Sequence, residues 1–114
     1  LFLGTCLSNV SHAAASQPTV LELYTSQGCS SCPPADAVLS QLAADPTLLP
    51  LSFHIDYWDR LGWTDPYSLS ESTARQHRYA QWLGRNNVFT PQLVVDGVIS
   101  VNGADQQAVQ RAIA

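Results

Sequence analysis

Two cysteines separated by two serines, Cys29 and Cys32, are the residues of this chain whose types and spacing point most directly to chemistry. They follow the apolar run 20–24 and precede a stretch that is compatible with a helix. A Cys-x-x-Cys pair at a strand-to-helix turn brings both sulfurs within bonding distance, and the partial positive charge of the helix N-terminus favours a thiolate. The motif predicts thiol–disulfide exchange, with Cys29 as the attacking thiolate and Cys32 as the resolving thiol.

The same spacing also occurs in inert disulfides and in half of a zinc site. A structural zinc site needs two further ligands, usually as a second close pair. The remaining candidates stand singly, at Cys6, His12, His54 and His77, so zinc is disfavoured. Two other classes stay open: a noncatalytic ligand- or protein-binding module with a structural disulfide, and a protein that handles Cu(I) through Cys29, Cys32 and His54.

Composition restricts the class of protein. The chain has 114 residues, is 46% hydrophobic and carries a formal charge of −4, which fits one globular domain. Its five basic residues are scattered arginines, so no basic patch is present to bind nucleic acid. No apolar run approaches the roughly 20 residues that a membrane-spanning helix requires, and we predict no membrane span.

The first fifteen residues resemble the end of a secretory signal peptide. An apolar stretch is followed by small residues that end in an Ala-x-Ala cleavage site after Ala15. We therefore interpret residues 1–15 as a signal-peptide remnant, residues 16–114 as the mature domain, and the protein as secreted or periplasmic, where a disulfide persists. The alternative is a lipoprotein anchored through Cys6, which the residues Leu3-Gly4-Thr5 would precede as a cleavage box.

The apolar patterns predict an alternation of strands and helices around the cysteines. Strands are expected at 19–25, 48–57, 90–95 and 98–101, the last two joined by a tight turn at Asp96-Gly97. A first helix begins at Pro33-Pro34 and ends at Asp45-Pro46. A second begins at a capping box over 68–71 and ends at Leu83, with Gly84 after it. A last helix starts at Ala104, which gives the order β-α-β-α-β-β-α.

This order, with Cys-x-x-Cys after the first strand and Thr90-Pro91 before the third, resembles the thioredoxin superfamily. The resemblance implies an α/β three-layer sandwich around a mixed four-stranded sheet, with Pro91 in the cis form facing the dithiol. It also implies that Thr90 and Pro91 hold a substrate chain against the sulfurs, and that no bound cofactor is needed. In one branch of the superfamily a buried acid helps to move protons below the thiols, which makes Glu22 a candidate for that role.

Residues 24–36 and 54–63 more closely resemble a family of secreted bacterial proteins, catalogued as a domain of unknown function with a thioredoxin-like fold. Members of that family continue beyond the position of Ala114, so the resemblance implies that the domain is truncated at its C-terminus. The resemblance implies a fold for this chain but no reaction, because the family has no assigned activity. We expect protein or small-molecule thiols and disulfides as partners, and the oligomeric state stays open.

The remaining polar and aromatic residues permit several readings. Trp58 and Trp63 follow the second strand and are expected to form a wall of the substrate site, or else to pack as a satellite core. Glu22 is either a buried proton relay or an edge residue that points to water. His54 and Asp56 share a strand face and form a structural pair or approach the thiols. Arg75, His77 and Arg78 are expected on the solvent face of the second helix.

The cysteine turn itself departs from the thioredoxin pattern. Gly28 stands where an aromatic residue is usual, and the central dipeptide is Ser30-Ser31. Two serine hydroxyls can donate hydrogen bonds to a thiolate, which makes the pair more oxidising. The double proline after Cys32 is expected to delay the helix start and so to weaken the dipole at Cys29. The two effects oppose each other.

Overall fold

A mixed four-stranded sheet in the order β2-β1-β3-β4 forms the middle layer of the protein in a computed structural model, which describes residues 17–114. β1 (Thr19–Thr25) is parallel to β2 (Leu48–His54) and antiparallel to β3 (Gln92–Val95), and β3 is antiparallel to β4 (Ile99–Asn102). The predicted signal peptide, its cleavage site and the alternative anchor at Cys6 lie outside the described residues.

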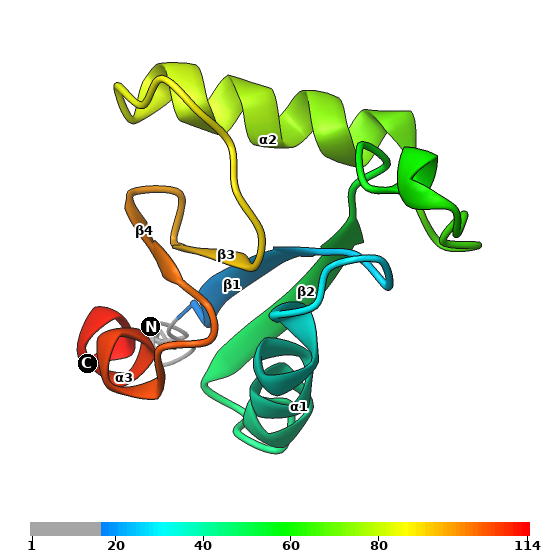
Figure 1. Cartoon of the computed structure of the whole chain (residues 1–114). Coiled ribbons are helices and arrows are strands. Elements are labelled where there is room, and N and C mark those ends of the chain that lie inside the picture. The colour runs from blue at the N-terminus through cyan, green and yellow to red at the C-terminus, as the bar shows by residue number, and fades with distance from the viewer. Residues whose placement is uncertain (1–16) are drawn as a thin grey trace, which may run out of the picture.

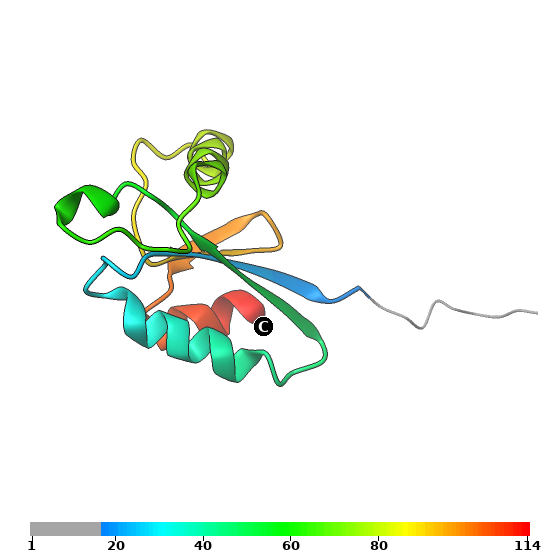
Figure 2. The ribbon, with the colours of Figure 1, turned by 90° about the vertical axis from the view of Figure 1, so that its right-hand side faces the viewer.

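Helices cover both faces of this sheet. α1 (Cys32–Leu42) and α3 (Gln106–Ile113) lie on one face and α2 (Ser70–Trp82) lies on the other (Figures 1 and 2). A short 3-10 helix, η2 (Asp59–Leu61), stands in the connection between β2 and α2. The predicted element order and the thioredoxin-like three-layer arrangement are confirmed.

Alternation along β1 divides the apolar core into two parts. Leu21 and Leu23 face α1 and α3 and pack with Ala35 and Val109, among others. Tyr24 faces α2 and packs in a second cluster with other buried side chains, namely Ile55, Tyr79 and Val94. Successive residues of a strand point to opposite faces of the sheet. Odd-numbered residues of β1 therefore face α1 and α3, and even-numbered residues face α2.

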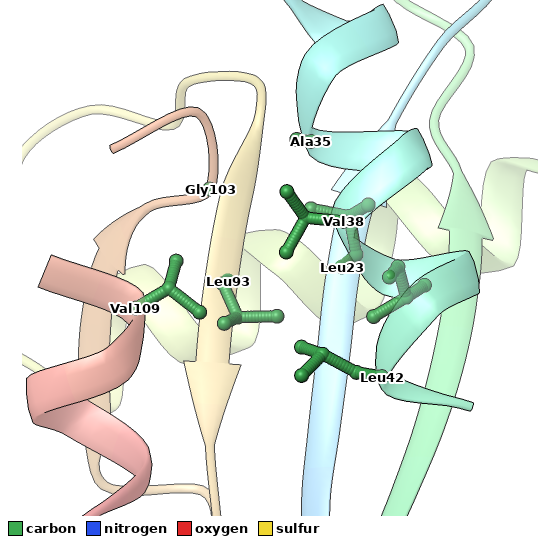
Figure 3. A pocket seen from close by; sticks show the side chains of 8 residues that line it. Leu23, Ala35, Val38, Leu42, Leu93, Gly103 and Val109 are labelled. Atoms are coloured by element: carbon green, nitrogen blue, oxygen red, sulfur yellow. The ribbon is translucent and has the colours of Figure 1, made fainter. Parts of the chain in front are cut away.

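Side chains from α1, α3 and the sheet enclose a small apolar gap of about 10 Å³. Figure 3 shows Leu23, Val38, Leu42, Leu93 and Val109 pointing toward one another around it. Its lining is apolar, so an ordered water molecule would find almost no hydrogen-bond partner there. The α1–α3 layer is therefore close-packed below the cysteine turn.

Two predicted turns are confirmed. Gly84 follows the C-cap of α2 with a φ of +69°, and the Arg85 amide donates to the Ala80 carbonyl, as in a helix end that needs a left-handed residue. Asp96 and Gly97 have φ values of +50° and +75°, which is the hairpin conformation that Asp-Gly favours.

Several element boundaries differ from the prediction. β2 ends at His54 instead of Tyr57, because its partner β1 ends at Thr25, and the Asp56 amide turns to bond Thr73 Oγ1 at 2.9 Å. β3 begins at Gln92 rather than Thr90, β4 spans 99–102 rather than 98–101, and the last helix begins at Gln106.

Two predictions about helix starts are wrong. The capping box over 68–71 does not form: Leu69 is the N-cap of α2, and Ser68 Oγ donates instead to Asp59 Oδ2 at 2.6 Å. The double proline does not delay α1, because the helix begins at Cys32 itself with the prolines in its first turn, where no amide donor is needed.

Candidate functional site

The turn between β1 and α1 carries the two cysteines as a disulfide. The Cys29 amide donates to the Ser26 carbonyl and the Cys32 amide to the Cys29 carbonyl, both at 3.2 Å, and these bonds fold the turn. The Cα atoms of the two cysteines lie 5.4 Å apart and their sulfurs are bonded. Cys32 is fully buried and Cys29 is only 5% exposed.

Polar groups lie close to the outer sulfur. Ser31 Oγ lies 3.7 Å from Cys29 Sγ, so the hydroxyl is in place to donate to a thiolate. α1 starts at Cys32, so the partial positive charge of its N-terminus lies beside the cysteine turn and favours an anion, although Pro33 and Pro34 contribute no amide hydrogen there. Both features stabilise negative charge on Cys29 in the reduced form.

The peptide bond between Thr90 and Pro91 is cis, and Pro91 is buried beside the first turn of α1. The Gly103 amide donates to the Pro91 carbonyl at 2.9 Å. A Cβ placed on Gly103 would lie 3.3 Å from the Ala35 Cβ and 3.5 Å from the Pro91 Cβ, so α1, the proline and the end of β4 meet at one point. The segment 90–91 therefore lies next to the helix that carries Cys32.

Trp58 connects the cysteine turn to this proline segment. Its Nε1 donates to Thr90 Oγ1 at 2.8 Å, and its Cβ lies 3.3 Å from where a Cβ on Gly28 would stand. Glycine at position 28 thus leaves the space that the Trp58 backbone and side chain occupy. Trp58 therefore reaches from the cysteine turn to the residue before the cis proline.

The loop that continues from Trp58 is tied to the same turn. Trp63, which is 58% exposed, donates through Nε1 to Gln27 Oε1 at 3.1 Å. The Gln27 amide in turn donates to Asp65 Oδ2 at 2.9 Å. Both tryptophans singled out from the sequence therefore lie against the cysteine turn, Trp58 beside Gly28 and Trp63 beside Gln27.

Asp65 is the buried anchor of this loop. Its carboxylate is only 1% exposed, and it accepts from His54 Nδ1 at 2.5 Å and from the Gln27 and Tyr67 amides at 2.9 and 2.8 Å. Burial raises the pKa of Asp65, but these hydrogen bonds to the charged form outweigh it and the net shift is downward. His54 pairs with Asp65 and not with Asp56, which accepts from Thr73 of α2.

Glu22 does not lie with the cysteines. It is 3% exposed on the α2 face of the sheet, where it accepts from Arg75 Nε at 2.7 Å, Tyr24 at 2.8 Å and Tyr79 at 2.5 Å. Burial raises the pKa of Glu22, but these donors lower it overall. Arg75 is thus not on the solvent face as predicted, whereas His77 and Arg78 are exposed.

A residue that the sequence analysis missed, Asp36, lies on the cysteine side. It stands four residues after Cys32 on α1, and its Oδ1 accepts from Thr25 Oγ1 at the end of β1 at 2.8 Å. Burial raises the pKa of Asp36; this effect exceeds the lowering by the Thr25 hydrogen bond and by His54, and the charge of Asp65 adds a smaller increase. The signal in the sequence was its position four residues after Cys32, which places both residues on one face of the helix.

Neither a metal cluster nor a membrane span is evident from residue 17 onward. These residues contain no group of three or more His, Cys, Asp or Glu side chains arranged to hold an ion. None of the helices described here is long and apolar enough to cross a membrane.

Comparison with known proteins links the chain to a family and to one solved structure. A family model described as "Protein of unknown function (DUF1223)" matches residues 20–114. The crystal structure of protein AGR_C_4864 from Agrobacterium tumefaciens is similar, with 46% sequence identity and a TM-score of 0.77. The match covers 86% of this chain and 46% of that one, so this chain spans less than half of that protein's length. No curated protein matches significantly.

Proposed function

We propose that this chain, which belongs to the DUF1223 family, is an exported thiol–disulfide oxidoreductase that works through a reversible Cys29–Cys32 disulfide. The observation that carries the proposal is the position of that disulfide. It lies at the N-terminus of α1, next to the Thr90-Pro91 segment, with a hydroxyl 3.7 Å from the outer sulfur. An inert disulfide needs none of these neighbours.

The reaction follows from the difference in depth between the two cysteines. In the reduced protein, the Cys29 thiolate attacks a partner disulfide, and a mixed disulfide forms as one partner thiolate leaves. Cys32 then attacks the Cys29 sulfur, the partner's second thiolate leaves, and the internal disulfide is restored. Two electrons pass to the partner, and the reverse sequence oxidises a partner dithiol. Cys29 is the outer of the two sulfurs, and Cys32 is enclosed.

The aromatic loop supplies the surface for the partner. Large apolar side chains from the end of η2 to the start of α2 stand exposed, namely Leu61, Trp63, Tyr67 and Leu69. The segment between β2 and α2 also contains three aspartates and a single basic residue, Arg60. An apolar polypeptide segment therefore fits this surface better than a small anionic thiol. Pro91 and Thr90 would hold that segment on the other side of the sulfurs.

The burial of Cys29 favours a second candidate, the noncatalytic binding module. In that case the disulfide fixes the turn, and the exposed aromatic loop binds a ligand by itself. The two candidates differ in what the tryptophans do. Replacing Trp63 with alanine would abolish ligand binding in the binding module and leave the reduction potential unchanged, whereas in the oxidoreductase it would slow exchange with a peptide partner.

The deciding experiment is the reduction potential of the cysteine pair, measured by equilibrating the protein in glutathione buffers. A value between about −120 and −270 mV lies in the range of working exchange proteins, and its place in that range gives the direction of electron flow. A value below about −300 mV is typical of structural disulfides and would reject the oxidoreductase in favour of the binding module. A Cys32→Ser variant that accumulates a mixed disulfide on Cys29 would identify the attacking sulfur.

A further inference from the structure

The second step of the proposed reaction requires a proton acceptor inside the protein. Cys32 must lose its proton before it attacks the mixed disulfide, because the thiolate is the nucleophile. Its side chain is fully buried, so bulk water has no direct access to the sulfur. Burial also disfavours a charged sulfur in the absence of a nearby partner. The proton must therefore pass to a neighbouring group.

Four of the five acids that are buried or half-buried among residues 17–114 do not fit this role. Asp56 and Asp59 already accept hydrogen bonds from the Thr73 and Ser68 hydroxyls. Glu22 lies on the α2 face, and its carboxylate already accepts from Arg75 and two tyrosine hydroxyls. Asp65 accepts three hydrogen bonds, including one from His54, and these bonds keep its pKa low. A carboxylate held so firmly in its charged form is a poor proton acceptor.

Asp36 is differently placed. It lies one helical turn after Cys32, and residues four apart on a helix stand on one face with Cβ atoms about 5–6 Å from each other. Side chains on a helix lean toward its N-terminus, which directs this carboxyl group toward Cys32. Thr25 donates the one side-chain hydrogen bond that Asp36 accepts among residues 17–114, which leaves lone pairs free for a further proton.

The charged and titratable groups around Asp36 come from three elements. Thr25 of β1 donates to it, His54 of β2 lowers its pKa, and Asp65 of the loop raises it, while burial is the largest effect. The result is a carboxyl group whose pKa is raised above its ordinary value, which is the direction that favours proton exchange with a thiol. Asp36 is also only partly buried, so a proton that it takes up can leave to water.

We propose that Asp36 is the proton acceptor for Cys32 in the resolving step. This inference rests on the proposed function. As the covalent S–H bond of Cys32 breaks, the proton moves to the Asp36 carboxylate. The electron pair left on the Cys32 sulfur forms the bond to the Cys29 sulfur. The bond between Cys29 and the partner sulfur breaks, and the partner leaves as a thiolate. Asp36 then returns its proton to water or to the departing thiolate, so it ends unchanged.

A reporter disulfide separates the two chemical steps. The reduced protein is mixed under anaerobic conditions with one equivalent of 5,5′-dithiobis(2-nitrobenzoate), which releases one coloured thiolate when Cys29 attacks and a second when Cys32 resolves the mixed disulfide. The rate of the second release is followed against pH in the wild type and in Asp36→Asn. Asparagine keeps an oxygen to accept from Thr25, so the fold is retained. Glu71→Gln, an exposed carboxylate in the first turn of α2, is the matched control.

We expect the second release in Asp36→Asn to be slower at neutral pH by about 10²-fold, the lower end of general acid–base contributions. Its rate should rise about tenfold for each pH unit, because hydroxide then has to remove the proton, while the first release is unchanged. Asp36→Glu should recover part of the rate and the flatter pH profile, which a merely structural role would not explain.

The outcomes distinguish this inference from the function on which it rests. If the wild type releases two equivalents and Asp36→Asn matches Glu71→Gln in rate and pH profile, the role of Asp36 is rejected and the oxidoreductase stands. If the wild type never releases the second equivalent, the proposed function itself fails. If Asp36→Asn slows both releases equally, its effect lies on the turn as a whole and the proton-acceptor role is rejected.

Discussion

Replacing Glu22 should destabilise the protein strongly without altering its cysteine chemistry. The carboxylate accepts from Tyr24, Tyr79 and Arg75, and both tyrosines are buried, at 0% and 5% exposure. In Glu22→Leu, each buried hydroxyl loses its acceptor, at a cost of about 1–3 kcal/mol per group. The Arg75 side chain is 40% exposed and can turn to water, so its contribution is smaller, about 0–1 kcal/mol.

Together these losses predict a decrease in the free energy of unfolding of about 2–7 kcal/mol, a large part of the roughly 5–15 kcal/mol that a domain possesses. Urea unfolding measures it, with Glu71→Gln as the control that removes an exposed carboxylate. The reduction potential should move by less than about 30 mV, because Glu22 lies on the opposite face of the sheet from α1. A loss below about 1 kcal/mol, or a larger change in potential, would refute this account of Glu22.

Three further predictions concern the packing, the charge and the loop around the site. In Gly103→Ala, the new Cβ would lie 2.9 Å from Leu23 Cδ1, so we expect a loss of about 1–3 kcal/mol in urea unfolding, and an unchanged stability would contradict the close packing. The pKa values of Glu22 and Asp65 are lowered in the folded protein, so the stability that they contribute is present above their ordinary values near 4 and is lost as the pH falls through the lowered ones. Urea titrations should show this contribution being lost below about pH 4, and a rise in stability in that acid range would contradict the sign. The raised pKa of Asp36 acts in the opposite sense, because its contribution is lost as the pH rises through the raised value. Asp65→Ala removes the acceptor of three hydrogen bonds, so trypsin should cleave after the exposed Arg60 about tenfold faster or more, and an unchanged rate would show that Asp65 does not hold the loop.

Local rules were sufficient to predict the element order and the turns. The Asp96-Gly97 turn and Gly84 were predictable because each requires a backbone conformation that few residues adopt. The helix start at Cys32 was missed because proline does not mark this boundary: in the first helical turn the backbone amides have no partner within the helix, so proline does not destabilise it.

The roles of the buried polar residues depended on contacts between distant segments, and these were the least predictable. Glu22 and Arg75 are 53 positions apart, and nothing local to α2 distinguishes Arg75 from Arg78. The choice between Asp56 and Asp65 as the partner of His54 depended on the path of an eleven-residue connection. The face on which Glu22 lies was predictable from the alternation along the strand. Glu22 and Leu23 must point to opposite faces of the sheet, so Glu22 could not share a face with the residues that pack under α1.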